Sequence, residues 1–252
     1  MPLRFTSHPS LIAYITCGDP DLATSREIIL SAIDAGADII ELGVPFSDPV
    51  ADGPVIQRAM ERACGNHVSL QDVLQLARDV RNARPDAGLV IFSYLNPILR
   101  FGLNAFAGAA KDAGVDAVLC TDLTVEESSD YTRALHAHGI APVFLAAPTS
   151  TDERLGRIAA ASRGFIYAVS RLGVTGAQAQ LSNDARDLVT RLKRITNTPI
   201  AVGFGVSNRE QFHSVGEFAD AVVIGSAIVS IIERERQNAP SAVHEFIRAL
   251  RA

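Results

Sequence analysis

Eight short apolar runs alternate with longer stretches of helical period along the 252 residues, and this alternation predicts an α/β fold, a single (β/α)₈ barrel of the TIM-barrel type. No change in composition and no linker divides the chain, so residues 1–252 are expected to form one domain. The alternative is a doubly wound open sheet. Eight strand–helix units in a chain of this length favour the closed barrel.

The predicted strands share a short apolar core that is rich in Val, Ile and aromatic residues. In chain order they are LIAYITCG (11–18), DIIELGV (38–44), GLVIFSY (88–94), AVLCTD (117–122), APVFLAAP (141–148), FIYAVS (165–170), PIAVGFGV (199–206) and AVVIGSA (221–227).

Helical stretches lie between these runs, for example at 24–36, 104–114, 125–139 and 182–195, and three of the four end in Gly, a common signal at a helix C-terminus. The segment AGADII at 35–40 is repeated in weaker form as AGVDAV at 113–118 and FADAVV at 218–223. These similar segments are consistent with a repeated helix–strand unit.

Composition excludes several classes of protein. The net charge of −5, without any basic block, argues against a nucleic-acid or anionic-membrane surface. No apolar run reaches the roughly 18–20 residues of a membrane helix, and the first residues have no export-signal pattern. Cys17, Cys64 and Cys120 are odd in number, and two of them lie in strand-like runs. Reduced thiols in a cytoplasmic protein are the simplest interpretation.

The stretch ELGVPFSDPVADGP (41–54) is unusual because a core strand ends on a glutamate and continues into an acidic, proline-rich turn. In a barrel of this kind the active site lies at the carboxyl ends of the strands. Strand alternation places Ile39, Glu41 and Gly43 on one face and Ile40 and Leu42 on the other. If the more apolar face meets the helices, Glu41 points into the barrel, where burial raises its pKa and suits it to proton transfer.

Two alternatives exist for Glu41, a structural ion pair or a strand register shifted by one residue. A second carboxylate, Asp52, follows in the same loop and strengthens the functional interpretation. Asp48 is a weaker candidate, because in an Asp-Pro turn it can simply bond its own backbone.

Glycine-rich loops follow the last three predicted strands. Gly203 and Gly205, then Gly225 and Ser226, and finally Gly176 in GVTG (173–176) stand where many such barrels bind phosphate through backbone amides and a helix N-terminus. Each glycine alone could serve backbone geometry only, but three such loops in succession predict a phosphate site.

Other chemistries lack their residues. The only two lysines, Lys111 and Lys193, lie within helical stretches, which argues against an imine-forming aldolase. The six histidines form no cluster at strand ends, so no metal site is predicted, and no Ser-His-Asp or Cys-His set stands out. With these chemistries excluded, two carboxylates that act on a phosphorylated substrate indicate a proton-transfer reaction. If a carbon–carbon bond breaks, the substrate must supply its own electron sink.

These segments together resemble the α subunit family of tryptophan synthase over nearly the whole chain. The matching motifs are YITCGDP (14–20), ELGVPFSDPVADGP (41–54), SYLNPILRFG (93–102), SRLGVTGA (170–177), GFGVS (203–207) and IGSAIVSIIE (224–233). The resemblance implies retro-aldol cleavage of indole-3-glycerol phosphate to indole and glyceraldehyde 3-phosphate. It implies no cofactor on this chain, since the pyridoxal phosphate would belong to a β subunit, in an α2β2 tetramer.

The resemblance also implies residue roles. Glu41 would be the acid–base group, Asp52 would hold the indole N–H, and Thr175 would close a loop over the site. The phosphate would rest on Gly176, Gly205, Gly225 and Ser226. The positions of the indole pocket would be Tyr14, Phe92, Tyr94, Leu119, Leu145, Tyr167, Phe204 and Ile224. For Leu119 and Leu145 ordinary barrel core is an equal alternative.

The same acidic loop would face the β subunit, with Pro45 and Asp48 meeting the partner. The stretch MPLRFTSHPS (1–10) departs from many relatives, which carry a helix there that plugs the barrel bottom. That helix is either reduced here or replaced by another closure. Two other functions stay open at this point, a free-standing indole-glycerol phosphate lyase and a non-catalytic subunit that only activates a partner.

Overall fold

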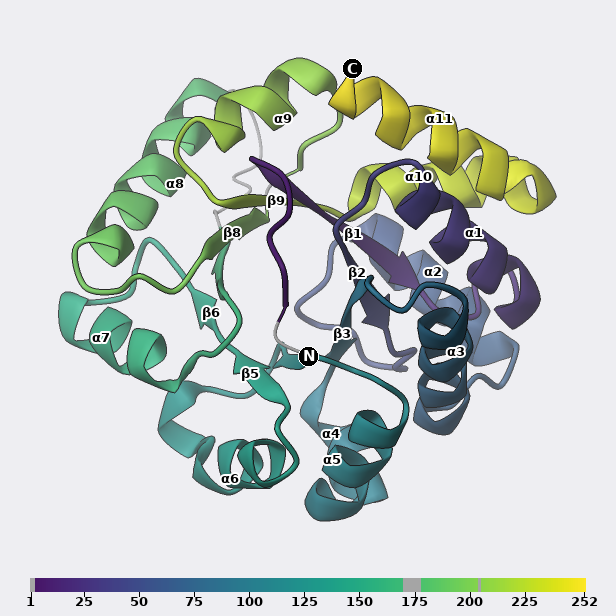
Figure 1. The fold of residues 1–252 in the computed structure, drawn as a ribbon, viewed down its shortest axis with the longest axis horizontal. Helices are drawn as coiled ribbons and strands as arrows, with labels where there is room; N and C mark the ends of the chain where they lie inside the picture. Colours follow the sequence, from purple (N-terminus) through teal and green to yellow (C-terminus); the bar gives the residue numbers. More distant parts are fainter. Residues whose placement is uncertain (1–2, 170–177, 204) are drawn as a thin grey trace.

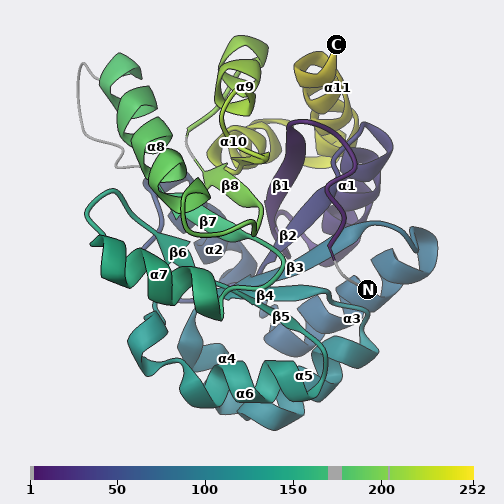
Figure 2. The same cartoon turned by 60° about the vertical axis from the view of Figure 1, so that its left-hand side comes forward.

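Parallel strands wind into a barrel with the helices packed around its outside (Figure 1, Figure 2). The computed structural model describes residues 3–169, 178–203 and 205–252, and only the backbone of residues 178–182. The hydrogen-bonded strand order is β5-β4-β3-β2-β1-β9-β8-β7-β6. The strands are β1 Ser10–Thr16, β2 Ile39–Gly43, β3 Gly88–Ser93, β4 Ala117–Cys120, β5 Ala141–Val143, β6 Leu145–Ala146, β7 Ile166–Val169, β8 Ile200–Gly203 and β9 Ala221–Ile224.

The fifth predicted strand is divided in two. Within residues 141–146, β5 pairs with β4 and β6 pairs with β7, so the two halves of one segment join opposite ends of the sheet. Phe144 lies between the halves, and its carbonyl accepts the N–H of Tyr167 at 3.1 Å. The nine assigned strands therefore occupy the eight positions of the predicted barrel, and the fold class is confirmed.

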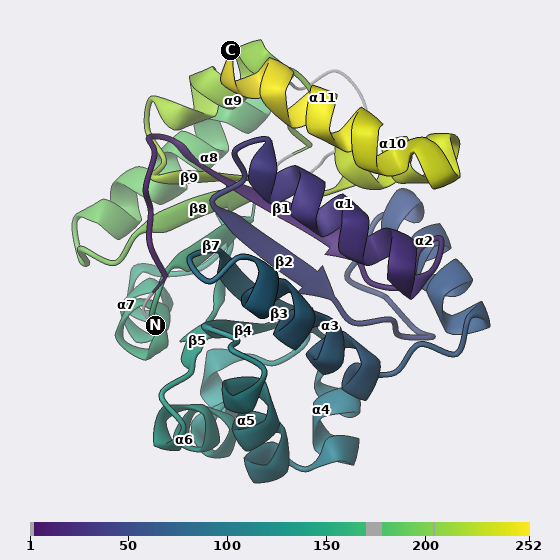
Figure 3. The same cartoon turned by 45° about the vertical axis from the view of Figure 1, so that its right-hand side comes forward.

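The helices follow the strands as the sequence predicts, with extra ones after β2, β3 and β9. The α-helices are α1 Leu22–Asp34, α2 Pro54–Gly65, α3 Leu70–Ala83, α4 Leu95–Phe101, α5 Leu103–Asp112, α6 Ser129–Ala137, α7 Asp152–Ala161, α8 Gln178–Lys193, α9 Arg209–Gly216, α10 Ser226–Glu235 and α11 Ala239–Arg251, and the short 3₁₀ turns are η1 Val125–Glu127 and η2 Arg236–Asn238. The last helix, α11, lies along α1 and completes the ring beside β1 (Figure 3). In the described ranges, none of these helices is both long and apolar enough to cross a lipid bilayer.

Strand alternation divides the apolar residues into two cores. Ile40 and Leu42 belong to the outer cluster between strands and helices, whereas Ile39 belongs to the cluster inside the barrel. The side chain of Glu41 therefore points to the inside, as alternation along β2 predicts.

The three similar segments at 35–40, 113–118 and 218–223 each place an aspartate at the amino end of a strand. Asp38, Asp116 and Asp220 each stand just before or at the start of a strand and accept a backbone N–H from a neighbouring strand, that of Leu11, Leu89 and Ile200 respectively, at 2.7–2.9 Å. Each aspartate also pairs with a cation, supplied by Arg251, Arg81 and Lys193. The repeated aspartate therefore satisfies a backbone N–H one residue before the pairing with the next strand begins.

The amino-terminal segment closes the bottom of the barrel without a helix. The described residues before β1 are not helical, and Leu3 and Phe5 pack against the interior cluster. The ring of Phe5 meets that of Phe165 edge-on, with centroids 6.3 Å apart. The sequence left open whether a reduced helix or another closure fills this end of the barrel. In the described residues, side chains of the non-helical segment fill the space.

Candidate active site

Glu41 is a fully buried carboxylic acid inside the barrel. Its side chain has no solvent exposure, and no described residue donates a hydrogen bond to either carboxylate oxygen. Burial raises the pKa of Glu41 to about 8, because a charged carboxylate loses its hydration there. At neutral pH the group is thus mostly protonated and can act as a general acid. No described residue forms an ion pair with it, so the described part of the chain gives no support to the structural alternative raised for this residue.

Asp52 stands in the loop between β2 and α2, where two hydrogen bonds fix its place. The Tyr94 hydroxyl donates to Asp52 Oδ2 at 2.7 Å, and the backbone N–H of Asp52 donates to the carbonyl of Pro49 at 3.1 Å. Burial raises the pKa of Asp52, and the hydrogen bond from Tyr94 opposes that rise. The tyrosine therefore favours the ionised form of a carboxylate in a partly dry site.

A cavity of about 230 Å³ opens at the carboxyl ends of the strands. Its size suits a small molecule. Nine of the residues singled out from the sequence line it, namely Tyr14, Asp52, Phe92, Leu145, Tyr167, Gly203, Gly205, Gly225 and Ser226. The structure thus brings together residues from β1, β3, β6, β7, β8 and the loops after β2, β8 and β9.

Two glycines make room for the tyrosines of this cavity. A Cβ atom at Gly43 would lie 2.5 Å from the hydroxyl oxygen of Tyr14, and one at Gly203 would lie 2.2 Å from that of Tyr167. Tyr14 also meets Phe92 edge-on, with ring centroids 4.9 Å apart. The small residues at the ends of β2 and β8 therefore set the width of the aromatic end of the cavity.

Another part of the cavity wall suits an anion. Gly225 caps the N-terminus of α10, and Ser226 is its first residue, so unpaired backbone N–H groups and the helix dipole face the cavity. Gly205 lies nearby with a φ of +45°, a conformation that favours glycine. Asp52 and Gly53 line the same cavity. One ligand could therefore contact an aspartate and an anion site at once.

Several expected pocket residues lie elsewhere. Tyr94 contacts Asp52 and stacks on Phe46 but does not line the cavity. Leu119 belongs to the buried core inside the barrel, the alternative given for it above. Ile224 packs in the outer cluster against the helices, and its neighbour Val223 lines the cavity instead. The expectation for Ile224 is corrected because alternation along β9 turns its side chain away from the barrel interior.

Glu41 is not among the lining residues either, although its register partner Tyr14 is. Thr175, Gly176 and Phe204 lie outside the described residues. The cavity also contains residues that sequence reasoning missed, which are Ala51, Gly53, Ile56, Thr121, Val169 and Val223. Thr121 and Val169 stand at the carboxyl ends of strands, so position alone could have identified them.

The acidic loop also borders the outer surface. Two shallow grooves of about 610 and 540 Å³ flank Phe46 and Ser47, the first lined by Asp48 and the second by Pro45. Asp48 is exposed, Pro45 is buried, and the apolar side chain of Val50 is 83% exposed. A partner contact at Pro45 and Asp48 stays a prediction.

Comparison with known proteins decides the family. The sequence model described as "Tryptophan synthase alpha chain" matches residues 3–251. The chain belongs to the tryptophan synthase alpha chain family. The tryptophan synthase alpha chain of Solibacter usitatus is 47% identical over 244 residues, which are 97% of this chain and 90% of the relative. That of Methylococcus capsulatus is 44% identical over 248 residues, 98% of this chain and 93% of the relative.

Solved tryptophan synthase structures share the fold. A chain of the tryptophan synthase α2β2 complex from Pyrococcus furiosus, described for its mutual activation, superimposes with a TM-score of 0.90 at 41% identity, covering 96% of this chain and 97% of that one. The tryptophan synthase subunit alpha of Legionella pneumophila gives a TM-score of 0.89 at 33% identity, covering 96% and 91%. The resemblance stated from the sequence motifs is therefore confirmed.

Proposed function

We propose that the chain, as the α subunit of tryptophan synthase, cleaves indole-3-glycerol phosphate to indole and D-glyceraldehyde 3-phosphate and supplies indole to a β subunit for tryptophan biosynthesis. The observation that carries the proposal is a buried Glu41, without a hydrogen-bond partner among the described residues, next in register to Tyr14 of a cavity with Asp52 and the N-terminus of α10 on its walls. This carbon–carbon lyase would be one domain, residues 1–252.

Glu41 would be the acid–base group. Its proton would pass to C3 of the indole ring, which converts the ring to an indolenine whose C=N bond can accept the electrons of the breaking carbon–carbon bond. The resulting carboxylate would take the proton of the glycerol hydroxyl next to that bond as the aldehyde forms. A pKa raised to about 8 keeps the acid protonated at neutral pH, as the first step needs.

Asp52 would accept the indole N–H and stabilise the positive charge that grows on that nitrogen. Its hydrogen bond from Tyr94 favours the ionised form that this role requires. The aromatic rings of Tyr14, Phe92 and Tyr167, together with the aliphatic side chain of Leu145, would hold the indole ring between apolar surfaces.

The phosphate would rest at the N-terminus of α10, on Gly225 and Ser226, with Gly205 opposite. Gly176 and Phe204 keep the phosphate and pocket roles, and Thr175 the loop-closing role, that the family resemblance implies. The β subunit would meet the loop of Pro45 and Asp48. The three free cysteines fit a cytoplasmic setting, and the proposal places no cofactor on this chain.

The test is indole release from indole-3-glycerol phosphate by the purified full chain, with and without its β subunit. We expect slow release alone and a strong rise with the partner. Glu41→Gln, which keeps the shape of the side chain, should lower the rate at least about 100-fold, since it removes the acid and base.

Each other outcome selects another function. Fast release without a partner would make the chain a free-standing lyase. Activation of the β subunit without any indole release would leave a non-catalytic subunit. Glu41→Gln at the wild-type rate would overturn the role given to Glu41.

A further inference from the structure

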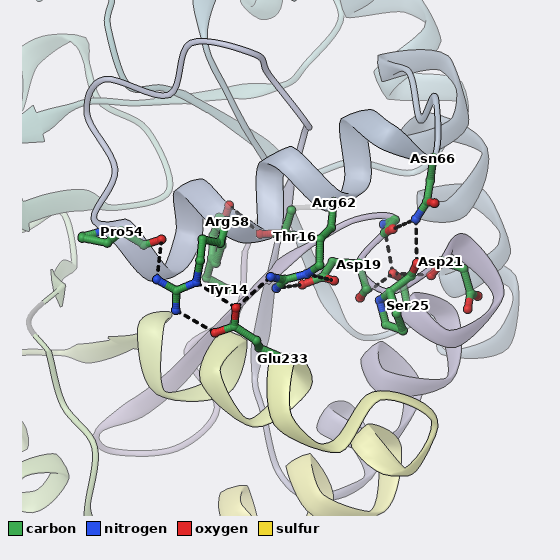
Figure 4. Close-up of polar contacts among 12 residues, drawn as sticks. Tyr14, Thr16, Asp19, Asp21, Ser25, Pro54, Arg58, Arg62, Asn66 and Glu233 are labelled. Atoms are coloured by element: carbon green, nitrogen blue, oxygen red, sulfur yellow. Dashed lines mark hydrogen bonds and ion pairs between the residues drawn. The ribbon is translucent and has the colours of Figure 1, made fainter.

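A cluster of four charged side chains lies outside the barrel, beside the active-site end (Figure 4). We call Asp19, Arg58, Arg62 and Glu233 the Arg62 cluster. Arg62 donates through Nε and Nη2 to the two oxygens of Asp19, at 2.8 and 2.7 Å, and through Nη1 to Glu233 Oε1 at 2.8 Å. Arg58 donates to both oxygens of Glu233, at 2.8 and 2.7 Å.

The centre of the cluster is sheltered from water. The Asp19 side chain is 2% exposed and that of Arg62 is 21% exposed, whereas an ordinary surface pair such as Arg26 and Glu27 is 39% and 58% exposed. A planar guanidinium can bind two carboxylates at once with fixed geometry, which an ammonium cannot do. The position of Arg62 is therefore defined by directed bonds as well as by charge.

The cluster joins the three elements next to which Tyr14, Asp52 and the anion site stand. Arg58 and Arg62 lie on α2, which begins at Pro54, two residues after Asp52. Glu233 lies on α10, which begins at Ser226 in the anion site. Asp19 follows β1, the strand that supplies Tyr14.

Further bonds fix α2 along its length. Arg58 Nη1 donates to the carbonyl of Pro54 at 3.3 Å, at the start of the helix. Asn66 Nδ2 donates to the carbonyls of Gly18 and Pro20, at 2.9 and 2.6 Å, beyond its other end. Among the side-chain hydrogen bonds of the described residues, those of Glu233 join α10 to this set. A shift of α10 relative to Asp52 thus requires that the contacts of Glu233 change.

We propose that Arg62 is a positioning residue for the lyase reaction, because it sets the distance between Asp52, ahead of α2, and the phosphate site at the start of α10. The inference rests on the proposed function. A substrate that contacts both Asp52 and the anion site depends on this distance. Inorganic phosphate, which contacts only the anion site, does not.

The experiment separates positioning from stability. Arg62→Met removes the charged head and keeps the length of the side chain. Its matched control is Arg251→Met, since Arg251 is also 21% exposed and also pairs with a sheltered aspartate, Asp38, at the opposite end of the barrel. Both variants should be destabilised to a similar degree in urea, because each leaves a buried carboxylate without its cation.

The two variants should differ in activity. With the β subunit present, Arg62→Met should lower kcat/KM for indole-3-glycerol phosphate about 10-fold or more, since small misplacements of reacting groups are costly. Arg251→Met should stay within about 2-fold of wild type, as a distant site does. The Kd of inorganic phosphate should stay within about 2-fold of the wild-type value in both variants. Arg62→Lys, which keeps the charge but not the planar, paired hydrogen bonds of a guanidinium, should recover part of the loss.

Glu233→Gln gives a second, milder test, because this side chain is 27% exposed and its loss leaves the pair of Arg62 and Asp19 in place. It should lower kcat/KM in the same direction. Equal losses in Arg62→Met and Arg251→Met would overturn the inference, and so would a loss of phosphate affinity that matches the loss of kcat/KM. Wild-type protein that releases no indole would overturn the proposed function itself, and this is seen before any variant is compared.

Discussion

The hydroxyl of Tyr94 joins two neighbouring positions of the acidic loop, because it donates to Asp52 Oδ2 at 2.7 Å and accepts the backbone N–H of Ala51 at 3.0 Å. Tyr94 caps the start of α4, so one side chain connects the end of β3 to the loop after β2. Its ring stacks on Phe46, with centroids 4.9 Å apart. The carboxylate therefore has a rigid support that comes from a different strand.

Tyr94→Phe should shift the ionisation of Asp52. The hydrogen bond stabilises the carboxylate and lowers its pKa, so its loss lets burial raise that pKa further. A larger fraction of Asp52 is then protonated at any given acidic pH, and the low-pH limb of kcat/KM moves to higher pH. At pH 7 we expect kcat/KM to fall about 10-fold, the usual cost of a hydrogen bond to a charged group.

A matched control is Tyr131→Phe. The Tyr131 hydroxyl is also buried and donates to the carbonyl of Val118 at 3.2 Å, but it lies in the outer layer. Loss of the Tyr131 hydroxyl should leave the low-pH limb of kcat/KM at the same pH as in wild type. If Tyr94→Phe also leaves the limb in place, Tyr94 does not govern the charge of Asp52.

The free energy of unfolding should depend on pH through Glu41. The pKa is about 8 in the folded protein and near 4.5 without the fold, so between these values the unfolded chain releases a proton that the folded chain keeps. The stability contributed by the protonated acid is complete below pH 4.5 and is lost as pH rises towards 8. The slope can reach about 1.4 kcal/mol per pH unit.

Urea unfolding of wild type and Glu41→Gln at pH 5, 6, 7 and 8 isolates this effect, since all other groups titrate in both proteins. The advantage of the variant should grow as pH rises. Parallel curves would mean that Glu41 is not held as a protonated acid.

Gly43→Ala should damage the aromatic end of the cavity. The new methyl group would stand 2.5 Å from Tyr14 Oη, so the ring must move from its place beside Phe92. We expect a rise in KM and a fall in kcat/KM of about 10-fold or more, since the ring walls position the substrate. The measurement is steady-state kinetics with indole-3-glycerol phosphate.

Gly156→Ala is its control. Apart from the nearby backbone of α7 and the two neighbouring residues, no described atom lies within 4 Å of a Cβ added there, and Gly156 is exposed on α7. Alanine should stabilise this helix by about 0.5–1 kcal/mol and leave kinetics unchanged. Wild-type kinetics in Gly43→Ala would show that Tyr14 has room to move without effect.

Local pattern was enough to predict much of the fold and part of the site. The strand positions and the inward direction of Glu41 follow from alternation, because Ile40 and Leu42 mark the outer face of β2. The position of Gly225 and Ser226 on the cavity wall at the start of α10 follows from the place of a glycine between a strand and a helix, and phosphate binding there stays a prediction.

Strand alternation predicts nothing where all residues of a strand are apolar, because it then does not indicate which side chains face the barrel interior. In β9 every residue from Ala221 to Ile224 is apolar, as in strands buried on both faces, so alternation does not say which of Val223 and Ile224 faces the cavity. The break at Phe144 is hidden in an apolar run for the same reason. Contacts between distant segments, such as that of Tyr94 with Asp52, depend on how loops pack and leave no local signal.

The repeated AGADII pattern is different again. The repeat can be recognised in the sequence, but the role of its aspartate as a hydrogen-bond acceptor cannot be predicted from it. The Asp38 carboxylate, for example, accepts from Leu11 N–H and from Ser7 Oγ and pairs with Arg251. Spacing predicts a helix–strand unit, whereas the acceptor role becomes evident only when β1 lies beside β2.

Asp38→Asn should therefore lower stability without touching catalysis. The amide keeps the shape of the side chain but leaves Arg251 without its counter-charge in a sheltered place, which should cost about 3 kcal/mol in urea unfolding. The kcat/KM should stay at the wild-type value, because Asp38 lies at the amino ends of the strands and the cavity lies at the other. Asp34→Asn, which weakens the more exposed pair of Asp34 and Arg84, should cost little by comparison. Equal losses in the two variants would show that the burial of Asp38 does not set its contribution, and a fall in kcat/KM for Asp38→Asn would show that the two ends of the barrel are coupled.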